Sequence, residues 1–386
     1  MGRQVGPSRW STAPSGACVG PTVSVVTGGA GFIGRHLVDA LLARGDEVRV
    51  LDVAPEPAND WSGEVDYRCA DVTDRRAVRD ACAGADVVFH AAALVHTRRS
   101  QRERMWAVNV GGTERVIDAC VEAGVARLVF VGAAIVVCDG REIMGGDESL
   151  PYAERAVEPF TATMVGAERR VRAANDPRGL RTVALRPTMV FGPDDPYFLP
   201  ALLGYLRQGR ARVQIGRGRW LWDATYVTNL IDALLLADEA LRRAREPDVL
   251  GRRPSRAVAG GAYFISNDEP MPFWEFVERM AYRLGLPPPR FALPHQLAYT
   301  WAALRESAAR FGNDTVGPPD GLSRFSIRQM CTSTYFSIEA ARRDLGYEPA
   351  VSLADGIERT CAYVEAMGLG PTAARRGPHA TSLPSD

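Results

Sequence analysis

The most informative absence in this chain of 386 residues is lysine, because all 46 of its Lys or Arg positions are arginine. Any mechanism that depends on a lysine ammonium group is therefore excluded. The 46 acidic side chains balance the arginines, so the formal net charge is zero. Without a net field, the composition favours neither nucleic acid nor an anionic membrane as a partner. We expect a small-molecule partner, and the oligomeric state is left open.

Cysteine and histidine are scarce and scattered. The seven cysteines include no C-x-x-C pair, which indicates reduced thiols and not a disulfide framework or a zinc site. The five histidines show no metal-ligand spacing, so no metal is expected. No apolar run approaches the ~18 residues that span a bilayer. Residues 1–21 also lack the apolar segment of a signal peptide. The sequence therefore predicts a soluble, cytoplasmic protein.

Short β-branched runs alternate with helical patterns through the first half of the chain. The expected strands are 23–27, 47–52, 86–90, 126–131 and 181–186. The expected helices are 32–44, 76–83, 103–123 and 160–174. Strict alternation predicts an α/β fold, a doubly wound parallel sheet of the Rossmann type with helices on both faces.

After Pro187 the alternation loosens, which predicts a smaller, interrupted C-terminal substrate domain. We assign residues 22–187 and 227–262 to a dinucleotide-binding domain, and residues 188–226 and 263–369 to the substrate domain. The ends, 1–21 and 370–386, are expected to be disordered. The arginine-rich stretch 242–257 is interpreted as a solvated loop, and 297–311 as an amphipathic lid or surface helix, with membrane contact as the alternative.

A glycine-rich turn, Thr27–Gly34, follows the first strand and opens the first helix. Gly28 allows the tight turn, Gly31 lets the backbone approach a pyrophosphate, and Gly34 lets the helix lie close to the strand. The helix N-terminus, at Phe32 and Ile33, then faces the phosphates. This pattern predicts a site for NAD(P)H.

The second strand ends at Asp52, about 20 residues after the turn, where a carboxylate can accept hydrogen bonds from the adenosine ribose. A 2′-phosphate would meet a like charge there, so Asp52 favours NAD. Arg35, beside the last glycine, partly offsets that charge, and NADP stays open. The alternative role of Asp52 is a cap at the start of a loop.

Further motifs occur in a fixed order: Asp71-Val72, His90-Ala91-Ala92-Ala93, Asn109-Val110-x-Gly112-Thr113, Leu185-Arg186-Pro187, Phe191-Gly192-Pro193, Tyr226-Val227-x-Asn229 and Phe264–Asp268. With the glycine turn, they resemble the extended short-chain dehydrogenases/reductases, in particular the hydroxysteroid dehydrogenase-like branch, over residues 22–368. The resemblance implies further cofactor contacts: Asp71 and Val72 beside the adenine, Ala91, Ala92 and Ala93 along the pyrophosphate and ribose, and the backbone from Pro187 to Val190 at the nicotinamide amide.

That family uses a Ser, a Tyr and a Lys as its catalytic triad, with Tyr and Lys four residues apart on one helix face. By the resemblance, the three positions fall on Ala133, Phe160 and Met164. The lysine-free chain cannot hold a Tyr-x-x-x-Lys pair. Tyr152 lies eight residues upstream of Phe160, off the required face. The sequence therefore predicts a member without the catalytic triad.

Hydride transfer without that tyrosine needs another proton source. One is a nearby protein group. The nearby polar residues are His96, Thr97, Thr161, Thr163 and Tyr197, and His96 is the candidate among them. The alternative interpretation of His96 is a loop residue, and that of Thr161 and Thr163 is hydroxyls in the first turn of a helix. The other source is a substrate whose ketone is flanked by an acidic phenol or enol.

The predicted substrate pocket is apolar and partly aromatic. It comprises Ala133, Phe160, Met164, His96, Tyr197, Phe198 and Trp222. The aromatic members could equally be core of the smaller domain.

The leading functional prediction is an atypical NAD(P)H-dependent ketoreductase acting on a bulky polycyclic aromatic natural product. The chain resembles the triad-lacking ketoreductases of simocyclinone-type antibiotic (polyketide) biosynthesis. The alternatives are a non-catalytic dinucleotide sensor and a sugar or sterol epimerase–decarboxylase relative.

Overall fold

The computed structural model describes residues 21–56, 61–95, 99–154, 158–176, 178–207, 213–243, 258–309 and 323–369. Its centre is a seven-stranded sheet in the order β12-β7-β5-β4-β1-β2-β3, in which every neighbouring pair is parallel. These strands are β1 Val23–Thr27, β2 Glu47–Asp52, β3 Val65–Cys69, β4 Val87–His90, β5 Arg127–Val131, β7 Arg181–Pro187 and β12 Ala262–Ile265. The strand order reverses between β1 and β4, the point where ligands bind in open α/β sheets.

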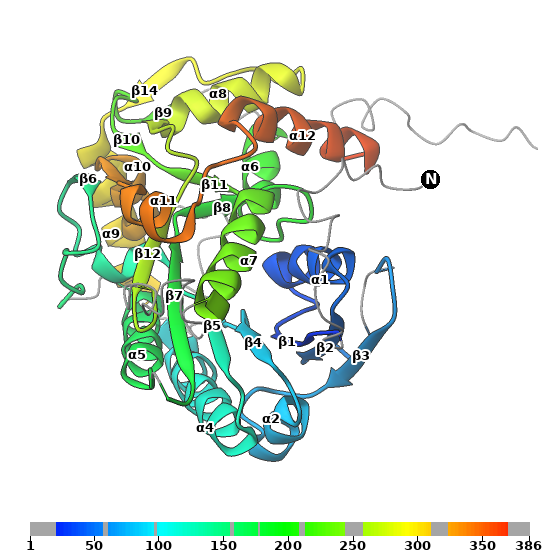
Figure 1. Ribbon diagram of the computed structural model, residues 1–386. Helices are drawn as coiled ribbons and strands as arrows, with labels where there is room; N and C mark the ends of the chain where they lie inside the picture. The colour runs from blue at the N-terminus through cyan, green and yellow to red at the C-terminus, as the bar shows by residue number, and fades with distance from the viewer. Residues whose placement is uncertain are drawn as a thin grey trace, which may run out of the picture.

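Helices cover both faces of this sheet (Figure 1). One face packs on α1 Phe32–Arg44, α7 Val227–Arg243 and α11 Glu339–Leu345, and the other on α2 Arg75–Cys82, α4 Thr113–Ala123 and α5 Pro159–Ala173. Adjacent strand residues divide between the two cores: Val25 packs with the second group of helices and Val26 with the first. The predicted doubly wound fold is confirmed.

The structure differs from the prediction at two places in the part of the chain that forms the central sheet and its helices. Strand β3 was not predicted, because its sequence VDYRC places no residue fully inside the core. The predicted helix 103–123 is three pieces: α3 Arg102–Met105, a π-helix Trp106–Gly112, and α4. Two consecutive glycines weaken α-helix here. The hydroxyl of Thr113 also donates to the carbonyl oxygen of Asn109 at 2.5 Å and competes with the helical ladder.

The remaining elements form a second unit above the carboxyl ends of the sheet (Figure 1). Its strands are β6 Ile143–Gly146, β8 Met189–Phe191, β9 Val213–Ile215, β10 Leu221–Trp222, β11 Ala224–Tyr226, β13 Met271–Pro272, β14 Phe291–Leu293 and β15 Thr334–Phe336. Its helices are α6 Phe198–Arg207, α8 Phe273–Arg283, α9 His295–Ala309, α10 Arg324–Met330 and α12 Leu353–Ala366. Strand β12 continues the central sheet past residue 262, where the predicted boundary was placed. The division into domains stays a prediction.

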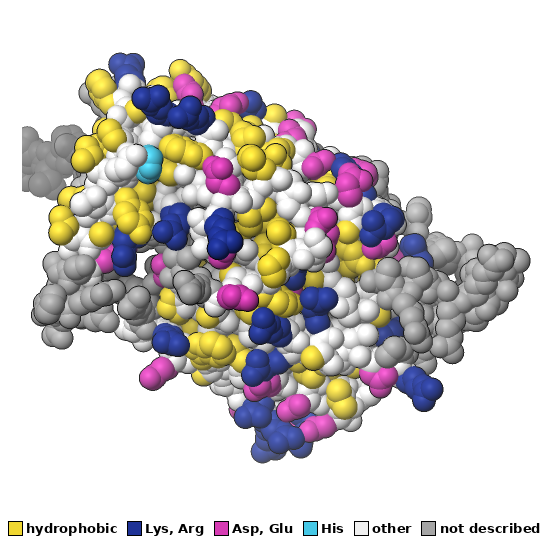
Figure 2. Space-filling model, turned by 90° about the vertical axis from the view of Figure 1, so that its left-hand side faces the viewer, with side chains coloured by type: hydrophobic (Ala, Val, Ile, Leu, Met, Phe, Trp, Pro, Cys, Tyr) yellow, Lys and Arg dark blue, Asp and Glu magenta, His cyan; other side chains and the backbone are white. Residues whose placement is uncertain are grey.

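The surface carries no single dominant charge on the face that includes β6 and α10. Figure 2 shows basic, acidic and apolar side chains intermixed there.

Helix α9 covers the described part of the predicted helix 297–311. It exposes Trp301, and the Arg305 guanidinium lies over that indole ring at 4.5 Å. No helix within the described ranges is both long and apolar enough to span a bilayer. The predicted disordered ends, apart from residue 21, and residues 244–257 of the predicted loop lie outside those ranges. The first two residues of that loop, Arg242 and Arg243, instead form the end of helix α7.

Candidate dinucleotide and substrate site

The turn between β1 and α1 accepts only glycine at its critical positions. Gly28 has φ +72°, and an added Cβ would lie 2.8 Å from the Ala92 backbone. A Cβ on Gly34 would lie 2.0 Å from the Gly28 carbonyl oxygen, so helix and turn are in direct contact. Gly31 faces only that same oxygen, at 3.1 Å, which leaves its outer side open to a ligand. Gly29, which the sequence did not single out, has no room for a side chain either, because an added Cβ would lie 2.6 Å from Val50 Cγ1.

The first turn of α1 is suited to an anion. Its N-cap is Gly31, no side chain caps the helix, and no acidic residue lies in its first turn. The N–H groups of Phe32, Ile33 and Gly34 are therefore available to phosphate oxygens, with the helix dipole behind them. This open, glycine-walled cradle fits the pyrophosphate of a dinucleotide.

Asp52 lies at the end of β2, beside the turn. Its Oδ2 accepts a hydrogen bond from Ala30 N at 3.0 Å, and its Oδ1 accepts one from Ala54 N at 3.0 Å. A carboxylate offers about four acceptor sites, so Asp52 can still accept ribose hydroxyls while it also ties the loop, its alternative role. Asp71 accepts from Thr73 N and Oγ1, both at 2.9 Å. Its predicted contact with adenine stays a prediction.

His90 is fully buried. Through Thr27 on one side and Thr113 on the other, it connects the glycine turn Thr27–Gly34, here called the cofactor loop, to the π-helix. Thr113 donates to Asn109 O, so the His90 Nε2–H must donate to Thr113 Oγ1, at 2.9 Å. The unprotonated Nδ1 then accepts from Thr27 Oγ1 at 2.7 Å, and Thr27 accepts from Ala92 N at 3.3 Å. Burial lowers the pKa of His90 to about 4, which keeps the imidazole neutral. Sequence reasoning noted His90 only as part of a motif.

The π-helix in turn holds the start of α5. Asn109 Nδ2 donates to Thr163 Oγ1 at 3.0 Å, and its Oδ1 accepts from Leu94 N at 2.7 Å. Thr163 itself donates to Phe160 O at 2.8 Å. Since the Thr163 hydroxyl is buried and already bonded on both sides, it is poorly placed to deliver a proton to a substrate.

The three predicted triad positions belong to, or pack against, the large apolar core on one face of the sheet. Met164 is 2% exposed within the core, and the half-buried Ala133 and Phe160 pack against the same cluster. Ala133 immediately precedes the short 3-10 helix η3 Ala134–Val137, which follows β5 at the carboxyl edge of the sheet. Pro187 ends β7 beside β5. These positions therefore lie on neighbouring elements, and their place around the nicotinamide stays a prediction.

A buried ion pair between α5 and β7 was not predicted. Glu168 Oε1 accepts from Arg186 Nη2 at 2.6 Å, and the two side chains are 0% and 2% exposed. The Tyr152 hydroxyl donates to the same carboxylate at 2.8 Å. Tyr152 thus belongs to the ion-pair network, and burial raises its pKa. That Tyr152 does not take the place of the catalytic tyrosine stays a prediction.

The predicted aromatic wall divides into different environments. Tyr197 is 59% exposed. Phe198 and Trp222 are partly buried against the second unit's core, with ring centroids 5.8 and 5.5 Å, respectively, from that of Phe276. The indole Nε1 of Trp222 is buried and has no hydrogen-bond partner within the described part of the chain, so a ligand could accept from it. The pocket role of these residues stays a prediction, and His96 lies outside the described residues.

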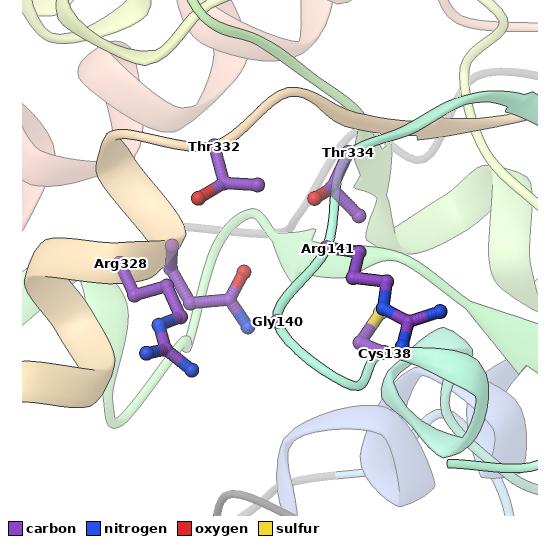
Figure 3. A pocket seen from close by; sticks show the side chains of 7 residues that line it. Cys138, Gly140, Arg141, Arg328, Thr332 and Thr334 are labelled. Carbon is purple, nitrogen blue, oxygen red and sulfur yellow. The ribbon is translucent and has the colours of Figure 1, made fainter.

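A small polar pocket lies between the loop after η3 and α10 (Figure 3). Its lining includes Cys138, Arg141, Arg328, Thr332 and Thr334, and its volume is about 30 Å³. That space corresponds to roughly one water molecule. It is too small for the predicted substrate.

The parallel sheet, the glycine cradle and Asp52 define an NAD(P)-binding oxidoreductase of the extended short-chain dehydrogenase/reductase type. Residues 25–295 match the 3-beta hydroxysteroid dehydrogenase/isomerase family, and the chain belongs to that family. The predicted resemblance to the hydroxysteroid dehydrogenase branch and the NAD(P) cofactor are therefore confirmed.

Several known proteins are similar over most of this chain. The human "sterol-4-alpha-carboxylate 3-dehydrogenase, decarboxylating" is 34% identical over 336 residues, 87% of this chain and 86% of that protein. The "2-alkyl-3-oxoalkanoate reductase" of Stenotrophomonas maltophilia (strain K279a) is 39% identical over 338 residues, 87% of this chain and 97% of that protein. The solved structure of MoeE5 in complex with UDP-glucuronic acid and NAD has 25% identity and a TM-score of 0.66, covering 89% of this chain and 99% of that chain.

Proposed function

We propose that this protein is a ketoreductase that uses NAD(P)H to reduce a carbonyl of a bulky polycyclic aromatic substrate, which brings its own proton. The observation that carries the proposal is that apolar residues, Ala133, Phe160 and Met164, occupy the triad positions of a chain that keeps the glycine turn and Asp52. The resemblance to triad-lacking ketoreductases of simocyclinone-type antibiotic pathways supports the same substrate class.

The energetics allow reduction without a catalytic tyrosine. General acid catalysis contributes about 10²–10⁴-fold, or roughly 3–5 kcal/mol. Holding the reacting atoms in line can contribute about 7–11 kcal/mol, and this part does not depend on the tyrosine. Loss of the acid therefore slows the reaction but leaves the larger contribution intact.

Positioning is the task of the residues that are present. The His90 chain ties the cofactor loop to the π-helix, and Asn109 ties the π-helix to α5. Reduced nicotinamide bound along this frame would supply a hydride to the substrate carbonyl carbon. Ala133, Phe160 and Met164 would exclude water from that carbonyl. The carbonyl oxygen would then take a proton from a neighbouring phenol or enol of the substrate, which regains one from solvent.

The name of one relative favours reduction, and the name of another supports a second candidate. The S. maltophilia relative is named as a reductase of 2-alkyl-3-oxoalkanoates. The human relative is named as a decarboxylating sterol-carboxylate dehydrogenase, so oxidation of a hydroxy acid with loss of CO₂ is the second candidate. Oxidation needs a base to remove the hydroxyl proton, and Phe160 and Met164 provide none at the triad positions. Reduction of a substrate that brings its own proton does not need such a base, so apolar residues at these positions favour reduction over oxidation.

The test is coenzyme oxidation by the purified protein in the presence of polycyclic hydroxyketones. We expect NADH or NADPH to be consumed. Turnover should persist when Thr161, Thr163, Tyr197 or His96 is replaced by alanine. Complete loss in one of these variants, with coenzyme binding retained, would assign the proton to that residue. Coenzyme binding without any oxidation would favour a dinucleotide sensor, and CO₂ release from a hydroxy acid would favour the decarboxylating dehydrogenase.

A further inference from the structure

The guanidinium of Arg35 lies beside the expected site of the adenosine ribose. Arg35 Nη2 donates a hydrogen bond to the Ala30 carbonyl oxygen at 3.3 Å. The backbone N–H of Ala30 donates to Asp52 Oδ2 at 3.0 Å. Arg35 and Asp52 therefore flank one residue of the glycine turn. A positive charge in this position is what a 2′-phosphate on the ribose would bind.

A carboxylate from a distant part of the chain already neutralises that charge. Asp194, in the loop after β8, forms an ion pair through Oδ1 with Arg35 Nη1 at 3.2 Å, and the two side chains are 10% and 18% exposed. The same oxygen accepts a hydrogen bond from the Tyr363 hydroxyl of α12 at 2.8 Å. Since the pair is largely buried, solvent and salt screen it less than a surface pair.

The backbone of Asp194 indicates that its side chain is needed there. Its φ is +67°, in the left-handed region, and Asp268 at +56° is the one other non-glycine residue with positive φ in the described ranges. Glycine would adopt this conformation at lower cost. Aspartate is one of the few non-glycine residues that adopt this region, and residues held there concentrate at functional sites. The functional partner of Asp194 is Arg35.

We propose that Asp194 is a specificity-determining residue that makes this site select NAD(H) over NADP(H). Asp52 repels a 2′-phosphate, and Asp194 holds the neighbouring Arg35 guanidinium that would otherwise attract it. The proposal rests on the cofactor site and not on the identity of the substrate, so it can be tested by binding alone.

The test variant is Asp194→Asn in the full chain. Asparagine keeps the size of the side chain, tolerates left-handed backbone and can still accept from Tyr363, but it carries no charge. Dissociation constants for NADH and NADPH are measured by calorimetry at low and at 0.5 M salt. We expect the NADH preference to fall about tenfold, mainly through tighter NADPH binding, with a smaller change at high salt.

Asp268→Asn is the matched control. Asp268 has the same residue type, the same left-handed backbone, and an ion pair with Arg342 at 2.9 Å, but it lies on another loop. The control should leave the coenzyme preference unchanged. The double variant Asp194→Asn/Arg35→Gln should return the preference to that of the wild type, because the gain in NADPH affinity acts through Arg35.

Three results would overturn the proposal: an unchanged preference in the Asp194 variant, an equal loss of affinity for both coenzymes, or a gain in NADPH affinity that survives removal of Arg35. Equal loss would make Asp194 a tether of its loop only. If the wild-type protein bound neither coenzyme, the proposed ketoreductase function would fail, and that outcome is distinct from the other three.

Discussion

Replacing His90 with phenylalanine is expected to change how the stability of the protein depends on pH. Burial lowers the pKa of His90 from 6.5 to about 4 in the folded state. The unfolded chain exposes the imidazole, which then takes up a proton near 6.5. Between these two pH values the unfolded state binds more protons. The stability tied to this group is therefore complete above pH 6.5 and is lost as the pH falls toward 4.

The magnitude follows from the two pKa values. A folded value of about 4 against 6.5 in the unfolded state removes about 2.5 kcal/mol of unfolding free energy between pH 7.5 and pH 4.5. Phenylalanine does not titrate and loses nothing by this route. It does leave the Thr27 and Thr113 hydroxyls without their ring partner, which we expect to cost about 2–5 kcal/mol at pH 7.5.

The assay is urea unfolding of the wild type and the His90→Phe variant, followed by tryptophan fluorescence at pH 7.5, 6.0 and 4.5. Titration of carboxylates elsewhere affects both proteins and cancels in the difference. We expect the stability gap between the two proteins to narrow by about 2.5 kcal/mol as the pH falls. A gap that is constant with pH, or that widens in acid, would refute a neutral, buried imidazole.

Three further outcomes follow from the described contacts. Glu168→Gln leaves the Arg186 guanidinium in a buried site without a counterion and should lower the unfolding free energy by about 3–5 kcal/mol. The control is Glu114, whose ion pair is exposed on the same face of the sheet, and Glu114→Gln should lower the unfolding free energy by less than about 1 kcal/mol. Burial raises the pKa of Asp223 from 3.8 to about 7. Its contribution to the unfolding free energy is therefore present below pH 4 and is lost as the pH rises through 7. In urea unfolding, the unfolding free energy of Asp223→Asn should rise relative to that of the wild type by up to about 4 kcal/mol over this pH range. Gly34→Ala should abolish NADH binding in calorimetry, because its Cβ would overlap a backbone oxygen of the turn, whereas Gly204→Ala, with open space around its Cβ, should bind NADH as the wild type does. The predictions for Glu168 and Gly34 are contradicted if the variant and its control have equal effects. The prediction for Asp223 is contradicted if stability depends on pH in the same way with Asp and with Asn at this position.

The first βαβ unit could be predicted from sequence almost to the residue. Val23–Thr27, Phe32–Arg44 and Glu47–Asp52 have the same bounds in the structure as in the prediction. The reason is local: β-branched runs are bounded by glycines whose positions leave the backbone few choices. Strand β3 lacks this signal, because edge strands with polar side chains do not alternate clearly.

The parts of the site that sequence reasoning missed depend on contacts between distant segments. The pairs Glu168–Arg186 and Arg35–Asp194 join elements separated by at least one strand or loop, and no local spacing marks them. The His90 chain has the same character, since each of its partners comes from another element. Periodicity finds elements, but it does not show which polar side chains meet between them.

The central claim is that the apolar site reduces a ketone whose own hydroxyl supplies the proton. The most direct measurement compares single-turnover coenzyme oxidation with a polycyclic ketone that carries an adjacent phenol and with the methyl ether of that same compound. We expect methylation to slow the reaction by about 10²–10⁴-fold while ligand binding is retained. Equal rates for the two compounds would contradict it and would place the acid on the protein.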